Sequence, residues 1–198
     1  MVFWCVAPMK DILSKALNGG GLEFEEAVRL LDCCREDFFS LIKAADVIRR
    51  RFCGDRMDLC SLINAKSGLC SEDCKFCAQS AKYNTGCSEY GFVDINKILE
   101  YAETAKGIGV SHFCIVTSGK SPNKEEFEKI KDAIIEIKKN VGIDVDCSLG
   151  KVAMEWIKEL KELGISRFNH NLETSEDFYG YMCTTHPFSD RVNMVNRL

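Results

Sequence analysis

The sequence predicts an α/β protein of the (β/α)8 barrel (TIM) type, of which only about the first four βα units are present, preceded by a helical extension. From residue 57 onward, strand-like runs alternate with amphipathic helical runs, which is typical of right-handed βαβ units with a parallel sheet. Several of the helical runs end at a glycine, as helices commonly do. A complete barrel of this type needs about 250 residues, and the whole chain has 198.

Residues 1–56 form the predicted N-terminal helical extension. A short amphipathic helix at 11–17 is stopped by the asparagine and three glycines of 18–21, a strong breaker. Apolar residues then recur at helical spacing in 22–31 and again in 36–52. We therefore expect helices there, packed ahead of the barrel rather than within it.

Residues 57–198 form the predicted barrel portion, truncated at its C-terminal end. We expect strands at 57–64, 110–117, 143–148 and 165–172, and helices at 93–106, 123–140, 151–163 and 174–182, with one more beginning near 189. In such barrels the functional residues lie at the carboxyl ends of the strands and in the loops that follow. The residues at these four positions are therefore the candidates for a site.

The loop after the first strand carries three cysteines, Cys70, Cys74 and Cys77. Three thiolates from one loop can hold a soft metal centre. Electron-transfer [4Fe–4S] centres and closed zinc sites take four ligands, so three leave one position open for another molecule. Buried thiols, or a zinc loop with a distant fourth ligand, are the alternatives at this point.

The later strand ends repeat the pattern of cysteines and polar residues. Cys114 lies in the second strand and Cys147 ends the third, although each can also be a small core residue. In strand geometry Cys147 shares a face with Ile143 and Val145. The fourth strand ends in Asn169, Asn171 and Glu173, which an extended backbone points to one side, where they suit a polar ligand; turn chemistry before a helix is the alternative.

Other cysteines and histidines give no motif. Cys60, Cys87 and Cys183 have no partner at motif spacing and are expected only to pack. His170 is expected to face away from the asparagines and to be structural, and His186 is interpreted as part of a turn before the last helix.

Composition narrows the class of protein. The net charge of −4 and the pI of about 5.5 argue against a nucleic-acid surface or a polybasic membrane face. No run approaches the ~20 apolar residues that span a bilayer, and the start, at Met1 or Met9, lacks a basic segment typical of an export signal. Twelve cysteines in such a chain favour thiolates that bind metal in a reducing, cytoplasmic setting.

The cysteine loop, Cys70-x3-Cys74-x2-Cys77 with Phe76 before the last cysteine, resembles the signature of the radical S-adenosylmethionine (SAM) superfamily. Three longer blocks, 64–86, 112–119 and 167–175, are together similar to the biotin synthase family, and 184–192 fits that family as well. The resemblance runs from about residue 10 to the end of the chain. It implies a radical SAM barrel.

The resemblance also implies roles for individual residues. Cys70, Cys74 and Cys77 would hold a [4Fe–4S] cluster whose open iron binds SAM. The remaining assignments, each implied by the resemblance alone, are Phe76, Asn171 and Glu173 toward SAM, Asn169 and Asn171 toward dethiobiotin, and Cys114 and Cys147 toward a sulfur-donating [2Fe–2S] cluster. Glu173 stands where the family commonly has aspartate or asparagine.

The implied activity is that of a radical SAM sulfurtransferase, which inserts sulfur into dethiobiotin by means of a 5′-deoxyadenosyl radical. The family further implies an electron donor such as flavodoxin or ferredoxin and a homodimer at full length. Because family ligands lie beyond residue 198, we expect a partial chain that does not turn over alone. Another radical SAM enzyme of the same barrel class, or a non-enzymatic iron–sulfur or zinc module, are the alternatives.

Overall fold

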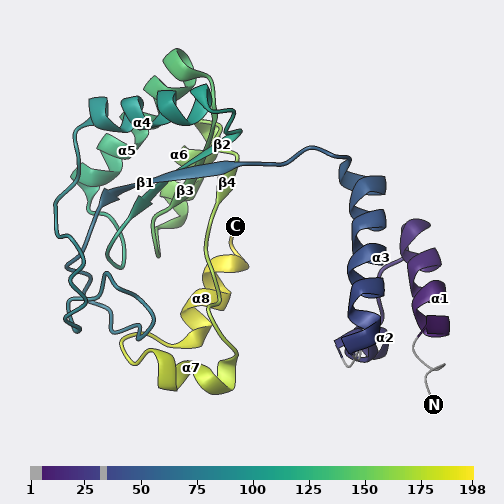
Figure 1. Ribbon diagram of the computed structural model, residues 1–198. Helices are drawn as coiled ribbons and strands as arrows, with labels where there is room; N and C mark the ends of the chain where they lie inside the picture. Colours follow the sequence, from purple (N-terminus) through teal and green to yellow (C-terminus); the bar gives the residue numbers. More distant parts are fainter. Residues whose placement is uncertain (1–5, 32–34) are drawn as a thin grey trace. The chain divides into compact units, whose positions relative to one another are not determined.

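The computed structural model describes residues 6–31 and 35–198 and has two compact units, Met1–Met57 and Asp58–Leu198. The first unit contains three helices, α1 (Val6–Leu17), α2 (Phe24–Leu31) and α3 (Arg35–Cys53). The ammonium of Lys15 in α1 lies 2.8 Å from the carboxylate of Glu26 in α2. The three predicted N-terminal helices are thus present (Figure 1).

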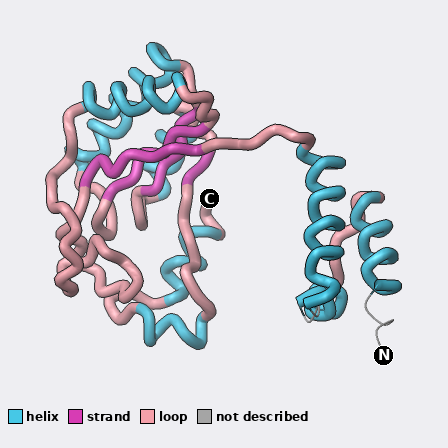
Figure 2. The backbone as a smooth tube through the Cα atoms, in the orientation of Figure 1, coloured by secondary structure: helices cyan, strands magenta, loops and turns pink. Residues whose placement is uncertain are grey.

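The second unit alternates strands and helices as predicted. Its elements are β1 (Cys60–Lys66), α4 (Ile95–Gly107), β2 (His112–Thr117), α5 (Lys124–Glu136), the π-helix η1 (Ile137–Val141), β3 (Asp144–Ser148), α6 (Met154–Glu162), β4 (Arg167–Phe168), α7 (Glu176–Met182) and α8 (Phe188–Val195). The four strands form one parallel sheet in the order β1-β2-β3-β4. Parallel neighbours in sequence order are the arrangement of successive units in a (β/α)8 barrel, and Figure 2 shows all four strands side by side.

The two faces of the sheet differ sharply. Phe113 and Ile115 of β2, with Val145 and Cys147 of β3, are fully buried in the main hydrophobic core with apolar residues of α4 and α5. We call this side the helix face. The intervening residues point to the opposite side, the lumen face, where Leu62 of β1 remains 56% exposed. The core therefore lies on one side of the sheet.

Helix α5 begins with a complete capping box. Asn123 accepts a hydrogen bond from the backbone N–H of Glu126, and Glu126 accepts one from the backbone N–H of Asn123, both at 2.9 Å. Glu126 also lies 2.8 Å from the ammonium of Lys66 at the end of β1. A capping box satisfies two backbone donors that the first turn leaves free, and here it also anchors the helix to the sheet.

Two elements differ from the prediction. The helix expected at 123–140 is α5 followed by the π-turn η1, which closes at Gly142 with a positive φ of 67°. The strand expected at 165–172 pairs only over Arg167–Phe168, because its one neighbour in the described sheet, β3, itself ends at Ser148. The asparagines beyond it therefore lie in a loop. None of the described helices combines the length and apolarity that crossing a membrane requires.

Candidate functional site

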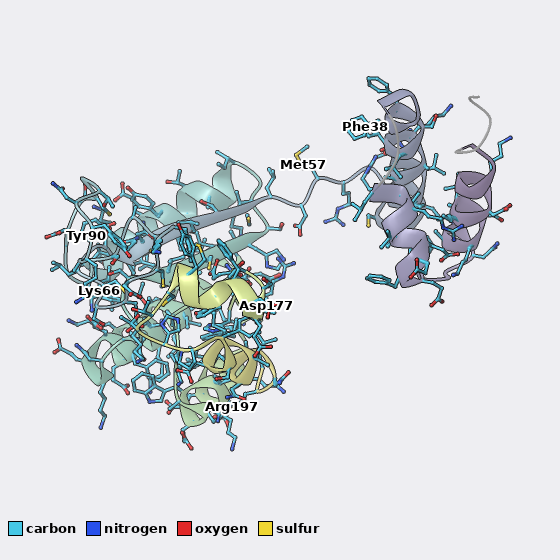
Figure 3. All side chains as sticks on the ribbon, turned by 90° about the horizontal axis from the view of Figure 1, so that it is seen from below. Phe38, Met57, Lys66, Tyr90, Asp177 and Arg197 are labelled. Atoms are coloured by element: carbon cyan, nitrogen blue, oxygen red, sulfur yellow. The ribbon has the colours of Figure 1, made fainter. Side chains whose placement is uncertain are left out.

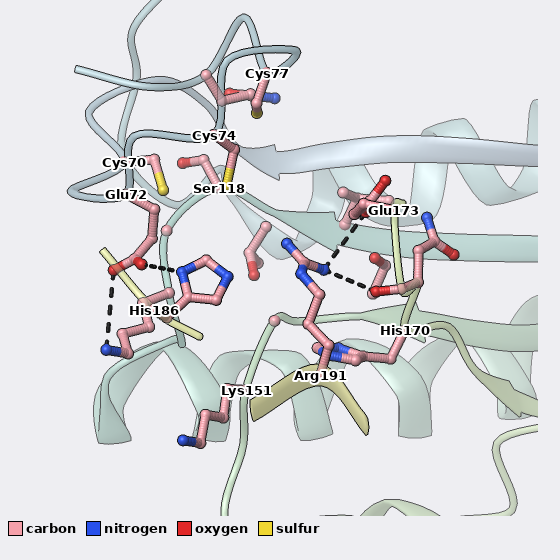
Figure 4. A pocket seen from close by; sticks show the side chains of 18 of the residues that line it. Cys70, Glu72, Cys74, Cys77, Ser118, Lys151, His170, Glu173, His186 and Arg191 are labelled. Atoms are coloured by element: carbon pink, nitrogen blue, oxygen red, sulfur yellow. Dashed lines mark hydrogen bonds and ion pairs between the residues drawn. The ribbon is translucent and has the colours of Figure 1, made fainter. Parts of the chain in front are cut away.

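A cavity of about 250 Å³ opens where the four strands end. Its wall includes all three signature cysteines together with residues from the ends of the later strands: Cys70, Cys74, Cys77, Thr117, Asn169 and Glu173. Figure 4 shows the cysteine loop at one end of this cavity, and Arg191 and Glu173 at the other. The convergence expected for a barrel of this type is therefore observed.

The cysteine loop has a fixed local conformation. Gly68 and Leu69 have positive φ angles of 75° and 54°, a left-handed conformation that is uncommon for leucine. The amide of Cys70 then donates to the carbonyl of Gln79 at 3.0 Å, and the side-chain oxygen of Gln79 accepts from the amide of Gly68 at 2.6 Å. Strain held in place by such contacts is typical of ligand sites.

A short antiparallel bridge holds the segment that leads from β1 into the cysteine loop. The backbones of Ser67 and Tyr90 exchange two hydrogen bonds of 3.1 Å, and the hydroxyl of Tyr90 donates to the carbonyl of Asn64 at 3.0 Å. Figure 3 shows Tyr90 beside Lys66 at the end of β1. The loop therefore leaves the sheet in a defined direction.

The distances between the three thiol sulfurs distinguish a single zinc ion from an iron–sulfur cluster. Cys70 and Cys74 are buried and Cys77 is half-buried, yet the three sulfurs are not all within 4.8 Å of one another. A single tetrahedral zinc ion with Zn–S bonds of about 2.3 Å would need sulfurs about 3.8 Å apart. In a cubane cluster each thiolate binds a different iron, so the sulfurs stand further apart. The spacing therefore argues against one tetrahedral ion on these three sulfurs and is compatible with a cluster.

The cysteine loop is joined to the segment after α7 by two carboxylates. Asp73 accepts hydrogen bonds from the amides of Thr184 and Thr185, at 2.8 and 3.1 Å, and its carboxyl pKa lies well below the usual value because of these donors and the Thr184 hydroxyl. Glu72 accepts from the Thr185 hydroxyl at 2.7 Å and lies 2.5 Å from Nδ1 of His186. Burial would raise the pKa of Glu72, but these hydrogen bonds lower it.

The other end of the cavity is organised by Arg191 of α8. Its guanidinium donates to the carbonyl of Asn171 at 2.9 Å and to the carboxylate of Glu173 at 3.5 Å. Its Nε donates to the hydroxyl of Tyr179 at 2.6 Å. Glu173 has a positive φ of 70°, which is strained for a residue with a side chain. One cation therefore holds the Asn171–Glu173 segment in place.

The cavity has chemistry suited to a polar ligand beside the cysteines. The hydroxyl oxygen of Thr117 is buried without a hydrogen-bond partner among the described residues, and buried polar atoms are normally paired. Phe76 lines the same cavity and is 51% exposed, so its ring is free to stack on a ligand. Together with the amides of Asn169 and Asn171, these groups fit a molecule such as SAM next to the thiols.

Cys114 and Cys147 do not form the pair that the resemblance implies. The register places Cys114 opposite Asp146 and Cys147 opposite Ile115, so the two cysteines point to opposite faces of the sheet. Cys147 is fully buried in the helix-face core, and burial raises the pKa of its thiol. A cluster cannot be held from both sides of a sheet, so this ligand pair does not fit.

The lumen face offers Cys114 a different neighbour. Asp146 lies beside it in the register and is 3% exposed, with its carboxylate 3.4 Å from Nδ1 of His112. Asn169 donates to the sulfur of Cys114 at 3.5 Å, and burial raises the pKa of that thiol to about 11. Neither Cys114 nor Cys147 is among the residues that line the cavity.

Several cavity residues were not expected from the sequence. His170, interpreted as structural, lines the cavity, and His186, interpreted as a turn, contacts Glu72. Arg191 and Glu72 also belong to the wall. Only the similarity of 184–192 to the biotin synthase family pointed to that region, because a lone histidine or arginine in a helical pattern carries no spacing signal.

Comparison with known proteins identifies the family. The model of the radical SAM superfamily matches residues 66–198. Among curated relatives, a biotin synthase from Persephonella marina is 42% identical over 94% of this chain and 56% of its own length, and one from Acetivibrio thermocellus is 43% identical over 92% and 57%. The resemblance to biotin synthases is confirmed, and the chain spans little more than half the length of these relatives.

Solved structures agree on the fold. A methylornithine synthase superposes with a TM-score of 0.80 at 21% identity, covering 94% of this chain and 55% of its own. The FeFe-hydrogenase maturase HydG from Carboxydothermus hydrogenoformans gives 0.77 at 19%, covering 96% and 44%. Radical SAM enzymes use a [4Fe–4S] cluster and SAM, and the cavity has residues suited to both. The chain belongs to the radical SAM superfamily, and biotin synthases are among its relatives.

Proposed function

We propose that this chain forms the cluster- and SAM-binding part of an enzyme that acts on dethiobiotin in the formation of biotin. The observation that carries the proposal is the meeting of Cys70, Cys74 and Cys77 with strand-end polar residues around one cavity. The identity of about 40% to curated biotin synthases supports the choice of substrate. Because the chain spans little more than half of those relatives, the whole reaction is proposed for the longer protein.

The roles proposed for the residues rest on the family resemblance, and their shared place around the cavity supports them. Cys70, Cys74 and Cys77 would hold the [4Fe–4S] cluster. Phe76 would stack on the adenine of SAM, while Asn171 and Glu173 would bind its polar groups. Asn169, next to Asn171 along the same wall, would contact dethiobiotin.

When bound, the reduced cluster and SAM supply a 5′-deoxyadenosyl radical that abstracts hydrogen from unactivated C–H bonds. The chain's own residues orient the partners and exclude water, which a reaction of this kind requires. Arg191 serves this purpose by fixing the backbone of Asn171 and the carboxylate of Glu173. An electron donor such as flavodoxin or ferredoxin, a homodimer and a cytoplasmic location stay predictions.

A specific observation favours a second candidate, another radical SAM enzyme of the same barrel class. Biotin synthases carry a [2Fe–2S] cluster as the sulfur source, and here the residue beside Cys114 on the lumen face is Asp146, with Cys147 turned into the core. An enzyme that performs hydrogen abstraction without inserting sulfur does not need that second cysteine.

Substrate-dependent cleavage of SAM distinguishes the two. The cluster would be reconstituted anaerobically, reduced with dithionite and assayed for methionine and 5′-deoxyadenosine with and without dethiobiotin. The proposal expects dethiobiotin to bind to the longer protein and to increase its cleavage of SAM. The variant Asn169→Ala should lose both the binding of dethiobiotin and the increase in cleavage. Cleavage that dethiobiotin does not change would favour the second candidate, and absence of any cluster would reject both.

A further inference from the structure

A cysteine outside the signature lies against one of the signature thiols. Cys183, at the end of α7, is buried, and its sulfur is 3.7 Å from the sulfur of Cys74 and 3.3 Å from Nδ1 of His186. The three ligand atoms all lie within 4.8 Å of one another, and they form the one such metal-ligating group found among the described side chains. Cys70 and Cys77 are not members of it.

These distances match the edges of a tetrahedral zinc site. Bonds of about 2.3 Å to sulfur and about 2.0–2.1 Å to nitrogen imply sulfur–sulfur edges of about 3.8 Å and sulfur–nitrogen edges of about 3.6 Å. The observed edges from Cys183, 3.7 Å to Cys74 and 3.3 Å to His186, require adjustments of a few tenths of an ångström. Two of the three edges therefore need little movement, and the third, between Cys74 and His186, lies within 4.8 Å.

The surroundings supply the remaining partners that zinc sites use. The carboxylate of Asp73 is 3.3 Å from the sulfur of Cys183, and that of Glu72 is 2.5 Å from Nδ1 of His186. The carboxylate of Asp73, or a water molecule, can complete the four ligands, while Glu72 gives up its contact with Nδ1 when zinc takes that nitrogen.

The imidazole of His186 is oriented by a chain of hydrogen bonds. Its Nε2 lies 2.8 Å from the hydroxyl of Tyr179, which accepts a second hydrogen bond from Nε of Arg191 at 2.6 Å. With zinc on Nδ1, the ring proton resides on Nε2, and this N–H donates a hydrogen bond to the oxygen of Tyr179. Such outer partners fix the tautomer of a metal-bound histidine, so the site has the support that a ligand histidine requires.

We propose that, without an iron–sulfur cluster, the chain binds one zinc ion through Cys74, Cys183 and His186. Binding releases the two thiol protons, as metal binding to cysteines does. Because Cys74 is also a signature cysteine, zinc at this site and a [4Fe–4S] cluster on Cys70, Cys74 and Cys77 exclude each other. The cluster-free loop is then held folded by an ion that must leave before the cluster forms.

The test is a zinc titration of the cluster-free 198-residue chain under anaerobic, reducing conditions, against a coloured chelator. We expect one zinc per chain. Cys183→Ala and His186→Ala should each weaken binding at least tenfold, since loss of even an outer partner costs about 10–100-fold. Cys70→Ala is the matched control: it removes a buried thiol from the same loop and should keep the wild-type affinity.

Cobalt(II) gives an independent readout of the ligands. We expect thiolate-to-cobalt absorption from two sulfurs in the wild type and in Cys70→Ala, and about half of it in Cys183→Ala. Circular dichroism verifies that each variant is folded; should Cys183→Ala be unfolded, Cys183→Ser replaces it. Three results would overturn the proposal: no stoichiometric zinc, zinc that depends on Cys70 and not on Cys183, or a Cys74–Cys183 disulfide under these reducing conditions.

The competition with the cluster is measured separately. Preloaded zinc should slow anaerobic reconstitution of the wild type and leave the rate in Cys183→Ala unchanged. If no cluster forms in either protein, the proposed function fails while the zinc titration still stands. If zinc binds with the expected ligands but does not slow reconstitution, the shared use of Cys74 is wrong.

Discussion

The placement of Cys147 in the helix-face core leads to a quantitative prediction. Removal of its sulfur in Cys147→Ala loses about 0.8 kcal/mol of transfer free energy, close to that of one methylene. A vacancy of roughly 25 Å³ adds about 0.6 kcal/mol at about 24 cal/mol per Å³. The free energy of unfolding should therefore fall by about 1–1.5 kcal/mol.

Cys147→Ser should be worse, because it puts a hydroxyl into a fully buried apolar position. A buried hydroxyl without a partner costs about 1–3 kcal/mol in proteins, so the total loss is about 2–4 kcal/mol. Cys114→Ser is the matched control on the lumen face. Its hydroxyl would find the side-chain amide of Asn169, which contacts the sulfur of Cys114 at 3.5 Å, and the loss should be smaller.

Urea unfolding followed by circular dichroism measures all three variants. With a slope of about 2 kcal/mol per molar urea, the midpoint should drop by about 0.5–0.75 M in Cys147→Ala and about 1–2 M in Cys147→Ser. Iron content after reconstitution should be unchanged in Cys147→Ala. The reasoning is refuted if Cys147→Ala loses a pair of irons, or if Cys147→Ser is as stable as Cys147→Ala.

Three further predictions rest on other contacts. Glu126→Gln keeps the size of the side chain but loses the charge opposite Lys66 at 2.8 Å, so we expect thermal unfolding to show a loss of about 1 kcal/mol. Glu173 has φ of 70°, so Glu173→Gly should be more stable than Glu173→Ala by about 1 kcal/mol, and the reverse order would exclude strain; both variants should bind SAM more weakly in equilibrium dialysis. The folded chain holds the pKa values of Glu72 and Asp73 below their ordinary values of 4.5 and 3.8, so the unfolded chain takes up protons first and stability should fall as the pH drops below about 4.5. An acid titration followed by circular dichroism checks this, and the double variant with Gln and Asn at these positions should show a weaker dependence.

The alternation of strands and helices could be predicted because each segment of 57–198 carries its own period. The strand-end rule then selected Cys70, Asn169 and Glu173, which the cavity brings together. These conclusions depend only on local pattern and on the geometry of parallel barrels. The same logic could not find Arg191 or His186, because their contacts are made across the fold.

Cys147 shows how two kinds of sequence argument can disagree. The period of two placed it with Ile143 and Val145, on the helix face, and the structure agrees. The resemblance assigned it to a cluster with Cys114, on the other face. A shift of one position in a strand reverses the side to which a residue points. A family role assigned one position away from its place in the strand therefore falls on the wrong face of the sheet, even when the residue found there is a cysteine.

Cys183 shows which contacts a sequence pattern cannot predict. It has no partner at motif spacing, and the segment between α7 and α8 approaches the cysteine loop only through tertiary contacts such as that of Asp73 with Thr184 and Thr185. A residue more than 100 positions away in sequence from Cys74 gives no periodic signal. The structure was needed to place the two thiols side by side.

The central claim is that Cys70, Cys74 and Cys77 together hold one [4Fe–4S] cluster with a position open to SAM. The most direct measurement is iron and sulfide analysis with electron paramagnetic resonance of the dithionite-reduced, reconstituted chain, alongside the variant with all three cysteines changed to alanine. The account predicts about four irons and four sulfides per chain, a cluster signal that SAM alters, and neither in the triple variant. A cluster that persists in the triple variant, or a signal that SAM leaves unchanged, would contradict it.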